Sequence, residues 1–118
     1  MIPKRTLGKI GEIESINYLN KLGYKILDWN VRTPYGEIDI LAIQNKELVV
    51  VEVKTRSTSN FGRPMEAVGY TKIEHLSNAA EYYQKHHPEL PQAVRIDVME
   101  VYSQPKLEFN LITRVDQS

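Results

Sequence analysis

Residues 36–56 read GEIDILAIQNKELVVVEVKTR, and this stretch decides the fold. Two runs of strand-forming residues, 37–43 and 48–54, flank residues 44–47, which have the length of a tight hairpin loop. We therefore expect the two runs to pair as antiparallel strands.

The loop also fixes the register of the predicted hairpin, because a turn centred on Asn45 and Lys46 leaves one set of cross-strand neighbours. One face of the ribbon would be apolar throughout, with the pairs Ala42–Val49, Ile40–Val51 and Ile38–Val53. The other face would carry the pairs Ile43–Leu48, Leu41–Val50, Asp39–Glu52 and Glu37–Lys54. Two carboxylates are thus predicted to be direct neighbours beside a lysine.

Asp39 and Glu52 would repel each other in this arrangement, because like charges directly opposite on a sheet are destabilising. Mg²⁺ bridging the carboxylates would compensate, since this ion is usually held by carboxylates together with water and phosphate oxygens. Lys54 would then stabilise charge that develops on a phosphoryl oxygen, which is the chemistry of phosphodiester hydrolysis. A solvated ribbon edge with a Glu37–Lys54 surface salt bridge would give the same pattern, and this alternative stays open.

A helix is expected over residues 6–22, with a buried stripe formed by Ile13, Ile16 and Leu19. Glu12 falls about 40° from the centre of that stripe when the chain advances about 100° per residue. A carboxylate on a buried stripe is costly unless it is paired or metal-bound, so Glu12 is a candidate third acid of the same site. An interaction with the helix dipole would explain its position as well.

The remaining periodicities complete an α/β order of helix, three strands, helix and two strands. Thr71 and Glu74 predict a T-x-x-E capping box at the start of the second helix, and Pro88 is expected to end that helix. We expect one domain over residues 1–118, with a first strand at 24–29, last strands at 92–102 and 107–112, an exposed loop at 55–63 and a tail at 113–118.

The composition excludes several classes of protein. The 118 residues contain no cysteine, so a disulfide framework, a thiolate zinc site and a cysteine nucleophile are impossible. No apolar stretch approaches the ~20 residues of a membrane span and the N-terminus has no signal-peptide block, so we expect a cytoplasmic protein without a membrane partner. The balance of 15 Lys+Arg against 15 Asp+Glu argues against non-specific coating of nucleic acid.

The segments GEID at 36–39 and VEVKTR at 51–56 resemble the signature of the YraN-like family of uncharacterised bacterial proteins. Further matching residues stand in the same order as in that family: Gly8, Gly11, Glu12, Asn30, Arg32, Phe61, Gly62, Lys72 and Arg95-Ile96-Asp97. The family is similar to archaeal Holliday-junction resolvases and to the PD-(D/E)xK superfamily. The resemblance implies a restriction-endonuclease-like fold, a central mixed β-sheet of about five strands flanked by helices, with a nuclease site that uses Mg²⁺ or Mn²⁺.

The resemblance also implies roles for individual residues. The superfamily's aspartate falls on Asp39, its second acid on Glu52 and its lysine on Lys54, and the helix acid of resolvase-like members falls on Glu12. All four are then expected to be catalytic, and the three acids are expected to bind the metal. Ile38 stands at the position of the superfamily's proline, which is often absent in the superfamily.

Basic residues near these motifs are candidates for contacts with a DNA phosphate backbone, namely Arg5, Lys9, Arg32, Arg56, Arg63 and Lys72. A solubilising surface role would explain each of these charges as well. Trp29 could stack on a base or serve only in packing, and Asp97 is expected to be structural, paired with Arg95 or Arg32.

Two functions follow from these observations. The first is a metal-dependent endonuclease that hydrolyses DNA phosphodiesters in branched or otherwise structured DNA, acting as a homodimer if a four-way junction is cut symmetrically. The alternative is a nucleic-acid-binding module with a nuclease fold and little or no catalysis, accessory to DNA recombination, repair or uptake. A protein-interaction scaffold that uses the sheet edge is a weaker third option.

Overall fold

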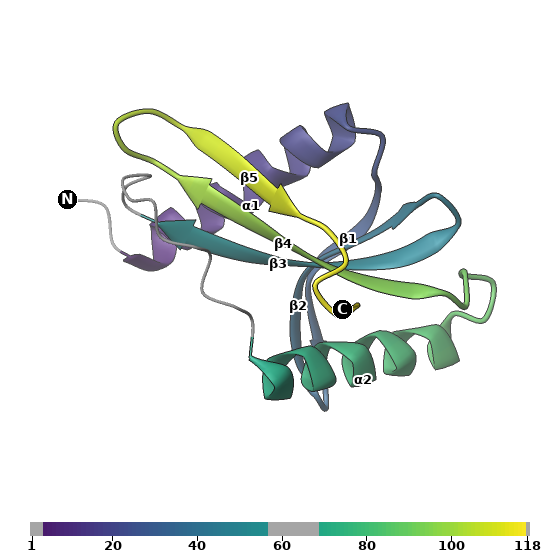
Figure 1. The fold of residues 1–118 in the computed structure, drawn as a ribbon. Coiled ribbons are helices and arrows are strands. Elements are labelled where there is room, and N and C mark those ends of the chain that lie inside the picture. The colour runs from purple at the N-terminus through teal and green to yellow at the C-terminus, as the bar shows by residue number, and fades with distance from the viewer. Residues whose placement is uncertain (1–3, 57–68, 118) are drawn as a thin grey trace.

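The computed structural model describes residues 4–56 and 69–117, with side chains from residue 11 onward. The elements follow the expected order of helix, three strands, helix and two strands, and Figure 1 shows their arrangement. They are α1 (Lys4–Lys21), β1 (Lys25–Thr33), β2 (Gly36–Gln44), β3 (Glu47–Arg56), α2 (Tyr70–His86), β4 (Val94–Tyr102) and β5 (Glu108–Ile112).

The five strands form one mixed sheet in the order β1-β2-β3-β4-β5. All neighbours are antiparallel except β3 and β4, which are parallel. Parallel neighbours need a crossover connection, and α2 lies in the connection between β3 and β4. The expected α/β class with a five-stranded mixed sheet is confirmed, and the arrangement is compatible with a restriction-endonuclease-like fold.

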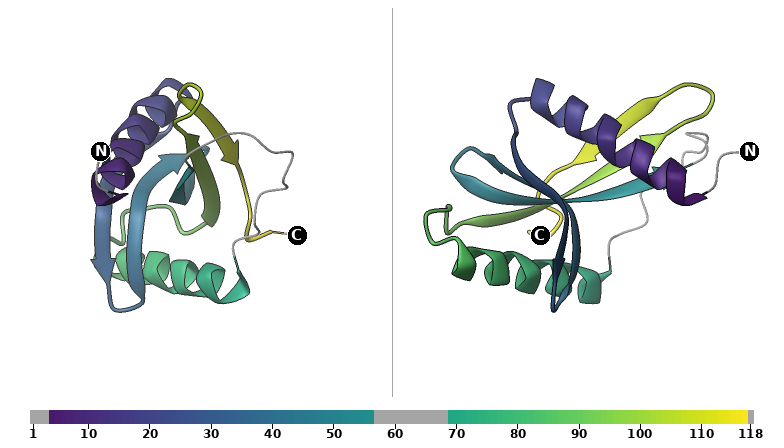
Figure 2. Two further views of the ribbon diagram at one scale, coloured as in Figure 1. Left: turned by 90° about the vertical axis from the view of Figure 1, so that its left-hand side faces the viewer. Right: turned by 180° about the vertical axis from the view of Figure 1, so that it is seen from behind.

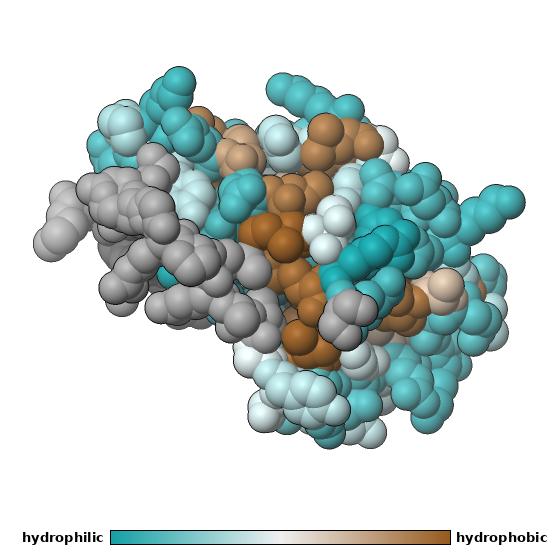
Figure 3. Space-filling view, in the orientation of Figure 1, coloured by the Kyte–Doolittle hydropathy of each residue, from teal (hydrophilic) through white to brown (hydrophobic). Residues whose placement is uncertain are grey.

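The two helices cover opposite faces of the sheet, as Figure 2 shows. On the α1 side, Leu19 packs with Ala42, Val49 and Val51, and on the α2 side Leu76 packs with residues that include Val50. Figure 3 shows hydrophobic side chains gathered in a band across the middle of one molecular face, bordered by hydrophilic residues. No helix among the described residues is long and apolar enough to cross a membrane.

The β2–β3 hairpin has the predicted register over part of its length. The ladder runs from Gln44↔Glu47 to Ile40↔Val51, and Asn45 and Lys46 take positive φ values of 50° and 63°, as in a tight two-residue hairpin turn. Beyond Ile40 the ladder ends, so the expected backbone pairing of Asp39 with Glu52 and of Glu37 with Lys54 is wrong.

The ladder ends because β1 and β2 bend together away from β3 and toward α2 (Figure 1). At the tip of this bent ribbon Tyr35 makes an edge contact with Tyr82 of α2, with ring centroids 6.5 Å apart. The bend also interrupts the alternation of β2, since Ile40 packs on the α1 side and Ile38 on the α2 side. The expectation that Ile38 shares a face with Ile40 is therefore wrong.

Two further expectations about helices need correction. Ile13 is 58% exposed, and the buried positions of α1 after residue 10 are Gly11, Ser15 and Leu19. The α1 face that meets the sheet is thus built partly from small residues, which allow close approach but carry little hydrophobicity. Helix α2 begins one residue before Thr71, with Gly69 as N-cap and no side-chain cap hydrogen bond, so the predicted capping box is absent.

Candidate active site

The end of the β2–β3 ladder places Asp39 against the backbone of β3. Its Oδ2 atom accepts a hydrogen bond from the backbone N–H of Val53, with an N–O distance of 2.9 Å. The side chain thus satisfies a donor that strand pairing would otherwise have used. This contact holds the carboxylate at the point where the two strands separate.

Glu52, the neighbour of Val53 on β3, shares a side-chain hydrogen bond with Asp39. Burial, this hydrogen bond and the charge of Glu52 raise the pKa of Asp39 to about 8, and the charge of Glu12 adds to the increase, while the Val53 N–H opposes it. Asp39 therefore keeps its proton at neutral pH. Like-charge carboxylates that share a site behave in this way unless a cation is present.

Lysine 72 of α2 supplies one positive charge to this pair. Its Nζ atom lies 3.1 Å from Oε2 of Glu52, whose side chain is only 8% exposed. The contact is an ion pair without the angles of a hydrogen bond, because Oε2 of Glu52 accepts no hydrogen bond among the described residues. Lys72 therefore faces an acid of the site. It can take its predicted role as a phosphate contact only when this ion pair with Glu52 is released.

Asn30 connects two further acids to the site. With its amide nitrogen turned toward them, Asn30 donates to Glu12 at 3.0 and 3.2 Å and to Glu37 at 3.1 Å. Its backbone has φ 52°, and it is skipped in the β1–β2 ladder between Trp29↔Ile40 and Val31↔Ile38. Asparagine tolerates this left-handed conformation better than most residues do. Asn30 and Asp39 thus mark the same break in the ribbon on its two strands.

Lys54 lies two residues beyond Glu52 on β3, so the two side chains project from the same face of the strand. The side chain is half-buried, and within the part of the chain that the structure describes it forms no ion pair. Lys54 is therefore a cation beside the carboxylates, and no acid among the described residues neutralises its charge.

The other predicted basic contacts have separate surroundings. Arg56 lies 3.5 Å from the buried Glu100, and Arg32 is exposed on β1 opposite Glu37 in the ladder. Arg63, with Phe61 and Gly62 of the resemblance, lies outside the described residues, as do the side chains of Arg5 and Lys9. The described residues therefore form no continuous basic groove.

The donor set fits a hard divalent cation held by two protein carboxylates. No group of three or more acidic or histidine side chains among the described residues is arranged to hold a metal ion. Asp39, however, carries a proton that a cation could replace, and an oxygen of the adjacent Glu52 is buried without a hydrogen bond among the described residues. Mg²⁺ commonly uses one or two carboxylates and completes its shell with water and phosphate oxygens.

A second polar cluster lies at the opposite end of β3 and is structural in character. Asp97 is fully buried, and its Oδ1 lies 3.1 Å from Nε of Arg95, which is the first of the two partners considered from the sequence. Tyr24 donates to Oδ2 of Asp97 at 2.8 Å, and burial together with that carboxylate raises the pKa of Tyr24 to about 12. Arg95 also reaches Glu47, which binds Arg114.

The sequence pattern identified acids, but it missed the parts played by Asn30 and Glu37. Glu37 was expected opposite Lys54, and its carboxylate instead meets the amide of Asn30. An asparagine inside a strand-forming run is a signal of a backbone break, because such residues are depleted in strands and enriched at positive φ.

The family model and the similar proteins found for this chain agree on one family. Residues 11–101 match the model of the uncharacterised protein family UPF0102. A UPF0102 protein of Caldicellulosiruptor saccharolyticus is 44% identical over 112 residues, covering 92% of this chain and 95% of the relative. A UPF0102 protein of Thermodesulfovibrio yellowstonii is 46% identical over 99 residues, covering 80% of this chain and 84% of the relative.

Among solved structures, SfsA of Pyrococcus furiosus in complex with Ca²⁺ is similar at a TM-score of 0.41 and 18% identity. The match covers 96% of this chain and 64% of that chain.

Proposed function

The chain belongs to the uncharacterised protein family UPF0102, and from the geometry of its carboxylate site we propose that it is a metal-dependent endonuclease that hydrolyses DNA phosphodiesters. The observation that carries the proposal is the pair formed by the half-buried Asp39 and the buried Glu52 at the end of the β2–β3 ladder, with the pKa of Asp39 raised to about 8. The half-buried Lys54 lies on the same strand face as Glu52. We expect the substrate to be branched or otherwise structured DNA.

Asp39 and Glu52 would hold Mg²⁺ or Mn²⁺ in this proposal, with Glu12 as an outer acid. When bound, a divalent cation supplies Lewis acidity toward a phosphoryl oxygen and lowers the pKa of a coordinated water. Asp39 is oriented for this task by the Val53 N–H, and Glu12 is oriented by the amide of Asn30. Lys72 neutralises Glu52 while no cation is present and is free to contact phosphate when a cation replaces it.

Lys54 has the role of stabilising negative charge on the phosphoryl group as the bond to the leaving oxygen lengthens. A fixed positive group close to such charge typically contributes a factor of about 10²–10³ in rate. The absence of an acidic partner for Lys54 among the described residues supports this role, because a neutralised lysine would contribute little. Arg32 is exposed on the same bent ribbon as Asp39 and is assigned to the DNA backbone.

The test is cleavage of branched, flapped, single-stranded and fully paired DNA in Mg²⁺ or Mn²⁺. We expect Asp39→Asn, Glu52→Gln and Lys54→Met each to lower the cleavage rate by roughly 10²-fold or more. Glu14→Gln, the same chemical change two residues from Glu12, is the matched control and should cut like the unmodified protein. The proposal is wrong if no DNA is cut, or if the three variants cut as well as the control.

The homodimer belongs to the same proposal, since two symmetric cuts in a four-way junction call for two copies of the site. Sedimentation of the protein with and without junction DNA measures the stoichiometry. Two chains per junction are expected, and one chain per junction would remove the dimer from the proposal.

The second candidate function is a DNA-binding module with little catalysis. It is favoured by the finding that no three acidic or histidine side chains among the described residues are grouped to hold a metal ion. This function predicts DNA binding that weakens as salt rises, with no metal-dependent cleavage of any substrate. Calorimetric titration of Mn²⁺ separates the candidates further, because the endonuclease requires a binding event that Asp39→Asn removes.

A further inference from the structure

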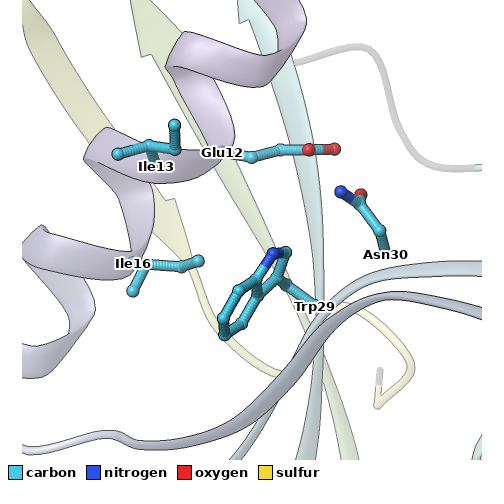
Figure 4. Close-up of a pocket in the computed structure, with 5 residues that line it drawn as sticks. All are labelled: Glu12, Ile13, Ile16, Trp29 and Asn30. Carbon is cyan, nitrogen blue, oxygen red and sulfur yellow. The ribbon is translucent and has the colours of Figure 1, made fainter.

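A small cavity opens next to the carboxylate site, between α1 and β1. It has a volume of about 170 Å³ and is lined by Glu12, Ile13, Ile16, Trp29 and Asn30. Figure 4 shows Ile13 and Ile16 on the helix, Trp29 below them, and Glu12 and Asn30 pointing toward each other at one end. The cavity therefore has an apolar part and a polar end, and the polar end belongs to the site described above.

The apolar part of the cavity is open to solvent. Trp29 is 55% exposed and Ile13 is 58% exposed, although both side chains are large and hydrophobic. Isolated exposed apolar residues are ordinary, but neighbours that together line one cavity beside polar groups are typical of a ligand site. The left-handed backbone of Asn30 has a direct effect here, because consecutive strand residues normally point to opposite faces and yet Trp29 and Asn30 line the same cavity.

We propose that this cavity binds an unpaired nucleobase, which stacks on the Trp29 indole next to the phosphodiester to be cut. The proposal rests on the proposed function and narrows its substrate to DNA with at least one unpaired nucleotide close to the cut. Trp29 is thereby a specificity-determining residue, while hydrolysis itself depends on the carboxylates and Lys54.

The size and charge of the cavity favour a base over other occupants. At about 170 Å³ it is smaller than the ~300–1,000 Å³ of sites for drug-sized ligands, so it takes one ring system. The carboxylate of Glu12 at its polar end disfavours an anionic phosphate and favours an amino group, such as that of cytosine or adenine. An indole is a good stacking surface, and base stacking on aromatic residues is common in proteins that bind single strands.

The requirement for an unpaired nucleotide follows from the position of Trp29. To reach such a cavity, a base within a duplex must unpair and unstack. The free-energy cost of this step is lowest when the base is already mismatched or unpaired. Bulges, flaps and junctions present such bases, whereas continuous duplex DNA does not. The cavity thus provides a physical basis for selecting structured DNA by a protein whose Lys+Arg and Asp+Glu counts are equal at 15.

Trp29 is the one tryptophan of the chain, so its fluorescence reports on the cavity directly. The experiment titrates the full-length protein, in Ca²⁺ in place of Mg²⁺, with a duplex that carries one unpaired cytosine. Two DNA molecules serve as controls. One is the same duplex without the bulge, and the other carries an abasic nucleotide in place of the unpaired cytosine. Quenching by the cytosine bulge alone is the expected result, because only that DNA offers an unpaired base.

Binding of the variants provides the second measurement. We expect Trp29→Ala to weaken binding of the cytosine bulge about 5- to 150-fold, corresponding to about 1–3 kcal/mol per stacked base, and Trp29→Phe to retain most of the affinity. Tyr35→Ala, which removes a half-exposed aromatic ring at the tip of the same ribbon, is the matched control and should bind like the unmodified protein.

Several outcomes overturn the assignment of the cavity. The assignment fails if Trp29 fluorescence stays unchanged while the bulged DNA is bound, or if the abasic bulge binds as well as the cytosine bulge. It also fails if the fluorescence changes with protein concentration in the absence of DNA, because that would indicate a second copy of the chain at Trp29. If DNA is cut equally by Trp29→Ala, hydrolysis stands and the cavity assignment fails. If the bulge quenches Trp29 and no DNA is ever cut, the cavity assignment stands and hydrolysis fails.

Discussion

At the scale of single residues, two opposing effects act on the pKa of the Asp39 carboxyl group. Its carboxylate accepts the N–H of Val53, which favours the ionised form, and it lies in a buried position beside Glu52, which disfavours that form. The second effect is larger, so the pKa rises to about 8. Without a cation this residue therefore reduces the stability of the folded protein at neutral and alkaline pH.

Asp39→Asn is expected to stabilise the metal-free protein at pH 8.5 by about 5 kcal/mol at most, the free energy of about four pKa units, and to flatten its pH dependence. The unfolded carboxyl ionises near pH 4, whereas the folded one keeps its proton up to about 8, so stability is greatest at low pH and falls as pH rises through this range. Urea unfolding in EDTA at pH 5 and pH 8.5 measures the effect. Glu81→Gln, an exposed change on α2, is the control, and an equal pH slope in both variants would contradict the prediction.

Asn30 offers a second prediction at this scale, because its φ of 52° is a conformation that most side chains resist. Asn30→Gly keeps the conformation and loses the amide, and Asn30→Ala loses the amide and adds backbone strain. We expect Asn30→Ala to be less stable than Asn30→Gly by about 1 kcal/mol in urea unfolding. Both variants remove the amide that contacts Glu12 and Glu37, so both should lose activity, and equal stability of the two would rule out backbone strain at this position.

At the scale of elements, the contact of α1 with β3 sets the position of Glu12. A Cβ atom added at Gly11 would lie 2.6 Å from Oγ1 of Thr55, closer than such atoms approach in proteins. The helix can therefore lie close to the strand only because residue 11 has no side chain. This close approach brings the adjacent Glu12 to the polar end of the cavity.

Gly11→Ala is expected to destabilise the protein by about 1–3 kcal/mol, as overpacking commonly does. Thr55→Ala in the same chain should restore part of that loss, because it removes the atom that clashes. A double-mutant cycle measured by thermal unfolding gives the coupling. Gly69→Ala is the matched control, since no atom lies within 4 Å of the added Cβ there, and a purely additive cycle would count against the contact.

The elements also show how far the sequence predicts this fold. Strand periodicity and turn chemistry are local, so they predicted the hairpin, a turn centred on Asn45 and Lys46, and the inner register. The end of the ladder was not predictable in this way, because it depends on the bend of β1 and β2 toward α2, a contact between distant segments. The exposed Ile13 was missed for a related reason, since hydrophobicity alone does not reveal a buried face that includes Gly11 and Ser15.

The acids of the candidate site were identifiable from spacing, but their geometry was not. Asp39 and Glu52 do share a hydrogen bond, although they meet through side chains at a separation of strands instead of as paired strand neighbours. The link from Asn30 to Glu12 depends on a positive φ at one residue, which residue type only suggests. Alternation of strand residues would have placed Trp29 and Asn30 on opposite faces.

At the scale of the whole molecule, a buried ionic network joins distant parts of the chain. Arg95, 2% exposed, contacts Asp97 on its own strand, Tyr24 before β1 and Glu47 at the start of β3. Glu47 in turn binds Arg114, which follows β5. The network therefore ties the segment before β1 and the segment after β5 to the sheet, at the end of β3 away from the candidate site.

Arg95→Met is expected to cost about 3–5 kcal/mol, because it leaves Asp97 buried without its charged partner. The double variant with Asp97→Leu should be less destabilised than Arg95→Met alone, since the uncompensated charge is then removed as well. Urea unfolding of the set measures both effects. Glu81→Ala, which breaks the exposed Glu81–Lys85 pair, is the control and should cost less than about 1 kcal/mol.

The parallel pairing of β3 with β4 has a consequence for the order in which the protein folds. β1, β2 and β3 pair as successive antiparallel neighbours, so their contacts close short loops, while β4 joins β3 only after the chain has formed the crossover that contains α2. Contacts distant in sequence form more slowly, because loop closure costs entropy before it is rewarded. The strands that carry Asp39 and Glu52 are therefore expected to associate early, and formation of the β3–β4 pair is expected to limit the folding rate.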